Sequence, residues 1–455
     1  MASTYLYRTN GTPTLGTKYT FSFWMKRSTE DADHRLVNNY VDSNNLGQIY
    51  IDATNNKLNI IDKSGGSTHL DVTVSHKFRD PAAFHHIVIA ADTTQGTAAD
   101  RLKVYINGTL QTDFALGASY PNQDAVLKMN AASATDQFRI GSHNGGGDYF
   151  DGNLAHFHFV DGTAYAASTF GETDSTSGIW KPIVSPTVTY GNNGYFLKFE
   201  NSGAMGTDSS GNTNTLTVSG TMTQNVDTPT NVFATLNPLD NPYVGQKASF
   251  SNANLTGAGT ETGFVAGTST FGFTAGKWYA EFKLTVGTSS FQAMGVITSP
   301  VDDLHQTAPH DSTKFYGVRG QGTKYQPGGS GTTSWAGSWT TNDIIGLALD
   351  CDNNRLYVSK NGQYADGSGN YDEAFTGAPA YITLASGQIY HFIGGSISTG
   401  SGVSLTMQAN FGSGFFGTTA VTSANSDANG HGEFEYEVPS GYYACNTKNL
   451  KEFGG

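Results

Sequence analysis

Apolar and small polar residues alternate in short runs along almost the whole chain. Residues 19–25 read Tyr-Thr-Phe-Ser-Phe-Trp-Met, with an aromatic ring at every second position at the start of the run. Because successive side chains of a strand point to opposite faces, this period of two predicts strands with one buried face. Similar runs lie at 48–52, 57–61, 85–90, 101–106, 137–140, 154–160, 195–199, 277–284, 292–297, 314–318, 344–350, 355–358, 389–393 and 404–411.

Turn-forming pairs separate these runs. Asn-Gly stands at 107–108 and 361–362, and Gly-Gly stands at 65–66. Such pairs adopt the positive φ angles of hairpin turns. No stretch carries a 3.6-residue apolar period of helix length, and the piece around 167–170 is the one helical turn expected in the first half. The pattern predicts an all-β, antiparallel protein with two sandwiches in tandem and a short C-terminal tail.

The region from about 187 to 243 interrupts the strand pattern. It is rich in Asn and Thr and contains Pro229, Pro238 and Pro242. Proline disfavours central strands and stiffens connections. The pattern therefore predicts a domain boundary near 237–245. The predicted parts are a sandwich at 1–200, a connection at 201–245, a second sandwich at 246–416 and a tail at 417–455.

Composition narrows the class of partner. The formal net charge is −13, and charged residues make up only 14% of the 455 residues. An acidic chain without a basic cluster is unsuited to nucleic acid or anionic membranes, because both are polyanions. No apolar run is long enough for a transmembrane helix, and the first residues do not resemble a signal peptide, so synthesis in a cytoplasm is expected. Cys351 lies in an apolar strand and is interpreted as a small buried hydrophobe, although a bridge to Cys445 remains possible.

The first half carries a series of motifs in a characteristic order. These are an opening strand at 19–25, Phe-His-His at 84–86, a Val-Tyr-Ile-Asn-Gly hairpin at 104–108, Phe-Arg-Ile-Gly at 138–141 and Phe-Asp-Gly-Asn-Leu at 150–154. The series resembles the laminin-G-like, concanavalin-type jelly roll over about residues 1–200. The resemblance implies two antiparallel sheets packed face to face.

The second half resembles a SPRY domain over about residues 246–416. Its motifs are Gly-Lys-Trp-Tyr-Ala-Glu-Phe at 276–282, Met-Gly-Val at 294–296, Asp-Ile-Ile-Gly-Leu-Ala-Leu-Asp at 343–350, the hairpin at 354–362 and Asn-Phe-Gly at 410–412. SPRY domains are also concanavalin-like sandwiches, so the resemblance implies the same architecture for both halves.

Four phrases resemble structural proteins of tailed marine bacteriophages. They read FDGNLAHFHFVDGTAY, FGETDSTSGIWKP, DTPTNVFATLNPL and YEVPSGYYACNTKNL. This resemblance implies a location in the virion, after assembly in the host cytoplasm. It also implies other virion proteins as partners.

A Gly-rich loop at 325–339 is the candidate ligand site. It contains Tyr325, Trp335 and Trp339. Exposed aromatic rings stack on sugar faces, and loops held by rigid sheets often carry recognition. The alternative is that these tryptophans pack into the core or into a subunit interface, as tryptophan usually does.

Calcium is the one metal ion for which the sequence suggests a candidate site, and no other cofactor is predicted. Laminin-G-like sandwiches often bind calcium at a rim, and Asp148, Asp151 and Asp208 lie in turns that supply oxygen ligands. Plain turn formation is the alternative for these aspartates. His156 and His158 lie two residues apart and would share a strand face, but two imidazoles alone are interpreted as ordinary sheet residues.

Catalysis is the main competing function. Glycosidases need two carboxylates on one face, and Glu433, Glu435 and Glu437 would share a face in an extended strand. This stretch lies in the predicted tail without a cleft of its own, so a solvated edge is the preferred interpretation. No nucleophile elbow, phosphate loop or zinc spacing is present. The sequence therefore predicts a protein that is not an enzyme, with a polysaccharide hydrolase as the alternative.

The predicted function is that of a virion structural protein on a tail fibre, tail appendage or capsid surface. Its sandwiches would dock to neighbouring virion proteins and contact host-surface glycans. A homo-oligomer would add avidity to weak single contacts. A free lectin-like module remains an alternative, and the tail at 433–455 is either an assembly strap or a disordered end.

Overall fold

The computed structural model describes residues 3–30, 32–115, 117–132, 137–144, 147–240, 248–260, 266–287, 292–299, 313–327, 331–396 and 404–454. The chain divides into two compact units, Met1–Gln224 and Asn225–Gly455. In the described residues, secondary structure is strand apart from short 3-10 turns and one α-helix, α1 (Thr447–Phe453). No helix among them has the length and apolar character needed to cross a membrane. The predicted all-β class is confirmed.

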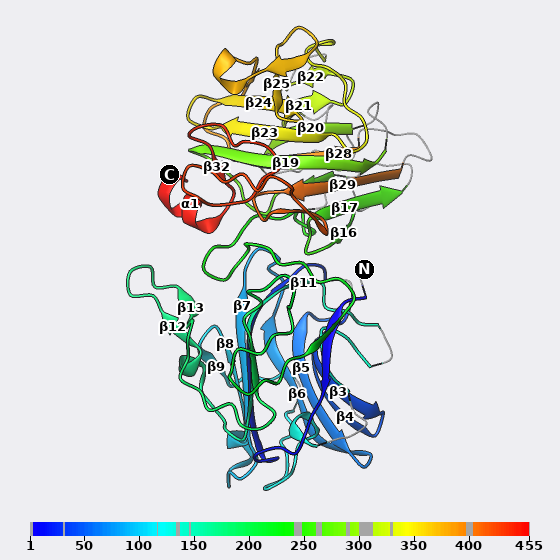
Figure 1. Ribbon diagram of the computed structural model, residues 1–455, viewed down its shortest axis with the longest axis vertical. Helices are drawn as coiled ribbons and strands as arrows, with labels where there is room; N and C mark the ends of the chain where they lie inside the picture. The colour runs from blue at the N-terminus through cyan, green and yellow to red at the C-terminus, as the bar shows by residue number, and fades with distance from the viewer. Residues whose placement is uncertain are drawn as a thin grey trace. The chain divides into compact units, whose positions relative to one another are not determined.

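The first unit contains two antiparallel sheets, which Figure 1 shows as separate layers, one with β3 to β6 and the other with β7 to β9. The seven-stranded sheet runs in the order β15 (Thr217–Ser219), β1 (Tyr5–Thr9), β10 (Gln137–Ile140), β3 (His34–Asp42), β4 (Asn45–Ile51), β5 (Lys57–Ser64) and β6 (Ser67–Lys77). The six-stranded sheet runs in the order β14 (Tyr195–Leu197), β11 (Gly152–Asp161), β2 (Lys18–Arg27), β7 (His85–Asp92), β8 (Leu102–Ile106) and β9 (Thr109–Gln111).

Strand register decides which side chains of the seven-stranded sheet enter the core. One row across the sheet is wholly apolar and almost fully buried: Leu6, Ile140, Val37, Ile49, Ile60 and Val72. The next residue of each strand points to the opposite face, and this second row consists of Tyr7, Arg139, Asn38, Gln48, Ile61 and Asp71. A shift of one residue would exchange the two rows, so burial of the apolar row fixes the outer one.

The outer face of the six-stranded sheet is covered by the chain itself. The hairpin of β12 (Gly171–Thr173) and β13 (Trp180–Pro182) belongs to the covering segment. Phe170 and Tyr190 from this segment pack with Val88 and Val160 of the sheet in a second apolar cluster. This face is therefore an interior layer, while the seven-stranded sheet keeps a half-exposed outer face.

The second unit is also a two-sheet sandwich. The larger sheet runs β16 (Ser249–Ser251), β17 (Thr256–Thr260), β29 (Ser404–Asn410), β19 (Lys277–Val286), β23 (Ile344–Asp350), β24 (Arg355–Lys360), β25 (Gln363–Ala365) and β26 (Tyr371–Glu373), with β27 (Ile382–Thr383) beside β24 and β32 (Tyr443–Ala444) parallel to β19. The smaller sheet runs β18 (Ala266–Thr268), β28 (Tyr390–Ser396), β20 (Gln292–Thr298), β21 (Phe315–Arg319) and β22 (Thr323–Tyr325).

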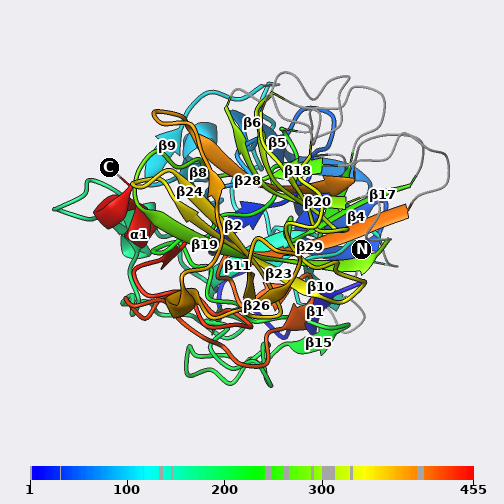
Figure 2. The same ribbon diagram turned by 90° about the horizontal axis from the view of Figure 1, so that it is seen from above.

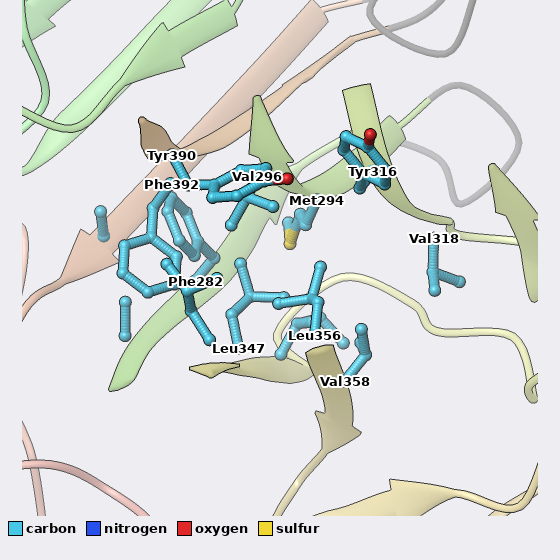
Figure 3. Close-up of a cluster of buried hydrophobic side chains, with 14 of the residues drawn as sticks. Phe282, Met294, Val296, Tyr316, Val318, Leu347, Leu356, Val358, Tyr390 and Phe392 are labelled. Carbon is cyan, nitrogen blue, oxygen red and sulfur yellow. The ribbon is translucent and has the colours of Figure 1, made fainter. Parts of the chain in front are cut away.

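Side chains of the two sheets meet in one core. Figure 3 shows Phe282, Leu347 and Leu356 of the larger sheet facing Val296 and Phe392 of the smaller sheet. All five are fully buried. The tandem sandwiches that the alternating pattern predicted are thus present, each with its own core.

The division of the chain differs from the predicted boundaries near 237–245. Strand β15 pairs with β1, so residues up to Gln224 belong to the first unit. The boundary prediction relied on proline-rich composition, which does not reveal that a short strand returns to the sheet edge. Residues 241–247 of the predicted boundary lie outside the described residues.

The C-terminal segment belongs to the second unit and is neither a solvated edge nor a disordered end. Phe434 is fully buried and meets the Tyr279 ring edge-on at 5.0 Å. Helix α1 lies beside the beginning of β19 in Figures 1 and 2, where the carbonyl of Phe453 approaches Gly276. The tail prediction missed this packing because Phe434 lies between two glutamates, which made the segment look polar.

One buried carboxylate fastens this segment to the larger sheet. Glu281 of β19 accepts the backbone N–H groups of Glu435 and Tyr436, each at 2.9 Å. It also accepts the Tyr279 hydroxyl at 3.3 Å and the Asn410 amide at 3.4 Å. Burial outweighs these hydrogen bonds and raises the pKa of Glu281 to about 7.

Candidate functional site

The predicted aromatic loop does not present its tryptophans to solvent. Trp335 is 6% exposed and Trp339 is fully buried, and both belong to the core of the second unit. Tyr325 is half-buried on β22, and residues 328–330 of the loop lie outside the described residues. Neither indole ring has a free face for a sugar. The core alternative is correct for both tryptophans.

The predicted calcium ligands are not brought together. The Asp208 carboxylate accepts the backbone N–H groups of Phe196, Ser210 and Asn214 at 2.8–2.9 Å, so it organises its own turn. Asp148 lies on a separate loop and forms an ion pair with Arg35 at 3.1 Å.

Asp151 lies near Asp148 in sequence, and its backbone carbonyl accepts hydrogen bonds from Ser28. His158 is buried, and its Nδ1 shares a hydrogen bond with the Tyr190 hydroxyl at 2.9 Å. Within the described part of the chain, no group of three or more His, Cys, Asp or Glu side chains is arranged to hold a metal. Both cysteines, Cys351 and Cys445, are free and buried.

A serine and a histidine meet in the covered layer of the first unit, but their geometry does not suit catalysis. His86 Nε2 lies 2.9 Å from Ser22 Oγ, and the indole N–H of Trp180 donates to His86 Nδ1 at 2.9 Å. An indole nitrogen only donates, so Nδ1 is unprotonated and the neutral ring carries its proton on Nε2. The ring therefore donates to Ser22 and does not act as its base, and both side chains are buried.

The glutamates of the C-terminal segment are used in local hydrogen bonds. The Glu435 carboxylate accepts the backbone N–H of Thr422 at 2.7 Å and also its hydroxyl. The backbone carbonyl of Glu433 accepts the Asn410 amide. These hydrogen bonds join the segment to other residues of the second unit.

The best candidate site is the half-exposed outer face of the seven-stranded sheet. Five partly buried tyrosines lie on it or on the loop beside it, and we call this surface the tyrosine face: Tyr5, Tyr7, Tyr40, Tyr50 and Tyr149. Its members come from strands β1, β3 and β4 and from the loop after β10. Neighbouring tyrosines touch, with ring centroids 5.9 Å apart for Tyr5 and Tyr7 and 6.5 Å apart for Tyr5 and Tyr149.

An arginine supports the ring at one end of this face. The guanidinium of Arg35 lies 4.0 Å from the centroid of the Tyr50 ring. Asp148 at 3.1 Å, Asp33 at 3.6 Å and Gln48 Oε1 at 3.2 Å hold the same guanidinium. These partners fix the arginine, and through it they restrict the ring of Tyr50. Burial raises the pKa of Tyr50, so its hydroxyl stays neutral and able to donate.

A second arginine supports the ring at the other end. The guanidinium of Arg139 lies 4.7 Å from the Tyr5 centroid and donates to the carbonyl of His143 at 3.1 Å. Arg139 is only 8% exposed, whereas Tyr5 is more exposed. The arginine therefore lies on the protein side of the ring and leaves the ring accessible. We call Arg35–Tyr50 and Arg139–Tyr5 the two platforms.

A buried amide pair lies next to the platforms, with Asn38 fully buried and Gln48 7% exposed. Gln48 Nε2 donates to Asn38 Oδ1 at 3.0 Å, across the directly paired strands β3 and β4. Tyr40 packs against His143 at 4.8 Å beside this pair. The partly exposed residues of this surface are tyrosines, whose flat rings and hydroxyl groups suit saccharide recognition.

Family models match both units. The model of the concanavalin A-like lectin/glucanases superfamily matches residues 2–168, and that of the SPRY domain matches residues 277–395. The chain contains a concanavalin A-like domain and a SPRY domain. The tyrosine face belongs to the concanavalin A-like domain, because most of its strands lie within 2–168.

Three solved structures that are similar to part of the chain are SPRY domains. The SPRY domain of human HERC1 shares 17% identity and covers 38% of this chain and 96% of its own, with a TM-score of 0.30. The PSpry domain of TRIM65 shares 10% identity, with 39% and 91% coverage and a TM-score of 0.28. A human SPRY domain shares 13% identity, with 36% and 96% coverage and a TM-score of 0.25. No curated protein matches the chain by sequence.

Sequence reasoning missed the tyrosine face of the concanavalin A-like domain. Tyr5 and Tyr7 flank the core residue Leu6, so alternation alone places both rings on the outer side of β1. What alternation does not show is that β1 and β4 belong to the same sheet, since β10 and β3 lie between them.

Proposed function

We propose that the protein is a non-enzymatic, two-domain binding protein, and that its concanavalin A-like domain binds a saccharide on the tyrosine face. The observation that carries this proposal is the set of four partly buried tyrosines on one sheet face and a fifth on the loop beside it, two of them held by arginines. An exposed aromatic surface of this kind marks a binding site more often than a simple solvated face. The matched superfamily includes lectins, which supports the same function.

Physical chemistry favours a sugar as the ligand. Tyrosine rings pack against the C–H faces of pyranose rings, and their hydroxyl groups exchange hydrogen bonds with sugar hydroxyls. Because the platform rings are already restrained by Arg35 and Arg139, binding loses little side-chain entropy.

A glycan array with the full chain tests this proposal. We expect the wild type to retain a defined set of oligosaccharides and the Tyr50→Ala variant to bind them about 2- to 10-fold more weakly. Tyr381→Ala is the matched control, because Tyr381 is an exposed tyrosine of the SPRY domain at 39% exposure. Equal binding by wild type and Tyr50→Ala, or no retained glycan at all, would reject the tyrosine face as a saccharide site.

We further infer that the protein is a structural component of a tailed bacteriophage particle, on a tail fibre, tail appendage or capsid surface. The support is the resemblance of four sequence phrases to phage structural proteins. In this setting the SPRY domain docks to neighbouring virion proteins, and the tyrosine face contacts glycans of the host surface. Mass spectrometry of purified particles should find the chain at a fixed copy number, and its absence from particles would contradict a virion role.

A further inference from the structure

The spacing of the two platforms sets the size of the ligand. Tyr5 lies on β1 and Tyr50 on β4, and β10 and β3 lie between them in the sheet. Neighbouring strands are about 4.8 Å apart, so three steps separate the platforms by about 14 Å. A single sugar ring is too small to contact both. A saccharide chain that runs across the strands reaches from one platform to the other.

Residues of the loop after β10 connect the two platforms, because the Tyr149 ring lies 6.5 Å from the Tyr5 ring and Asp148 binds Arg35 at 3.1 Å. Two residues further along the strands, a parallel row consists of Tyr7, Arg139, Asn38 and Gln48, and the last three of these are buried. The row runs across the strands, in the direction that joins Tyr5 to Tyr50.

Acidic side chains outnumber cationic ones around this stretch, because Asp52 and Asp71 also lie close enough to raise the pKa of Tyr50. Its cationic side chains are Arg35 and Arg139, and the acidic side chains beside them are Asp33 and Asp148. Both acids bind Arg35, which also stacks on Tyr50, so this guanidinium is already neutralised. The chain as a whole carries a net charge of −13. A polyanionic saccharide would therefore meet long-range repulsion without a compensating local patch.

We propose that the tyrosine face binds a neutral saccharide chain that lies across the strands and contacts both platforms, rather than a single sugar or an acidic polysaccharide. This inference rests on the proposed function and names the class of ligand for the same site. The reducing and non-reducing sides of the bound chain are held by aromatic contact at the platforms.

The test is an array that carries neutral oligosaccharides and their uronate- or sulfate-bearing counterparts, each in increasing length from a single sugar upward. We expect the full chain to retain neutral glycans only, with affinity rising with length until both platforms are occupied. Binding should change little between low and high salt. Single sugars that bind as tightly as long chains, or retention of acidic glycans only, would overturn this inference while leaving a saccharide site in place. An array without any retained glycan would overturn the proposed function as well.

Variants of the two platforms separate length recognition from a structural role. Tyr5→Ala and Tyr50→Ala should each lower affinity for a long neutral chain about 2- to 10-fold and leave affinity for the shortest retained glycan closer to the wild-type value. Tyr50→Phe keeps the ring and should retain most of the binding even if the alanine variant is unstable. Loss of binding in Tyr5→Ala at every chain length equally would contradict a site built from two platforms.

Discussion

Acid should destabilise the covered layer of the first unit through His86. Burial lowers the pKa of this imidazole from 6.5 to about 3. A histidine with a lowered pKa contributes stability above its unfolded pKa of 6.5, and this contribution is lost as the pH falls from 6.5 towards 3. At pH 4.5 the unfolded chain binds the proton almost fully and the folded chain hardly binds it. Because pH 4.5 lies about 2 units below the unfolded pKa, the free energy of unfolding falls by about 2.7 kcal/mol relative to pH 7.

The structure also shows what protonation would break. Nδ1 of His86 accepts the indole N–H of Trp180, so a proton on Nδ1 would place two donors against each other. The neighbouring groups give no compensation. Ser22, Trp24 and Trp180 are neutral, and His156 adds repulsion once charged. We expect the hairpin of β12 and β13 to loosen first, because Trp180 ties it to the sheet.

Hydrogen–deuterium exchange of the full chain at pH 7 and pH 4.5 measures this effect, after correction for the pH dependence of intrinsic exchange. Peptides from β7 and β13 should lose at least about 2.7 kcal/mol of protection in the wild type, because burial also lowers the pKa of His85 on β7 to about 4, and His86→Gln should lose clearly less. His143→Gln is a control on the half-exposed surface of the same unit. An equal loss of protection in wild type and His86→Gln would refute the assignment to this side chain.

Two further predictions concern the second unit. Since burial raises the pKa of Glu281 from 4.5 to about 7, its contribution to stability is full below pH 4.5 and is lost as the pH rises through 7. Denaturant titrations that follow unfolding of the second unit should show a loss of up to about 3 kcal/mol in the wild type and a clearly smaller loss in Glu281→Gln, and matching curves would contradict this. Phe434→Ala should lower the free energy of unfolding by about 3–5 kcal/mol, because it empties a fully buried site, whereas Glu437→Ala at an exposed position should change it little. An unchanged midpoint for Phe434→Ala would show that the C-terminal segment does not stabilise the unit.

The fold could be predicted from the sequence because the burial pattern of a strand is visible in a few consecutive residues. Phe21 and Phe23 alternate with Thr20 and Ser22, and this period of two predicts a strand, although the covering segment buries its second face as well. The same reasoning applied to the run at 344–350, which the structure shows as a fully buried central strand. The predicted runs therefore correspond to strands, whereas β1, β3 and β6 were not predicted from the alternation.

The candidate site could not be predicted in this way, since it depends on which strands become neighbours in the sheet. Tyr5, Tyr50 and Arg139 are far apart in the sequence, and only the order β1, β10, β3, β4 brings them to one face. The tryptophans of the loop at 325–339 show the converse. Trp335 and Trp339 look available in a Gly-rich segment, yet the segment folds them into the core between the sheets. Local composition does not distinguish an exposed ring from a buried one.

The most direct measurement is a titration of the full chain with the neutral oligosaccharide that it retains best on the array, compared with the Tyr5→Ala, Tyr50→Ala double variant. If the aromatic rings of the seven-stranded sheet form the saccharide site, the wild type binds and the double variant binds at least about 10-fold more weakly at unchanged thermal stability. An intact affinity in the double variant would place the site elsewhere on the protein.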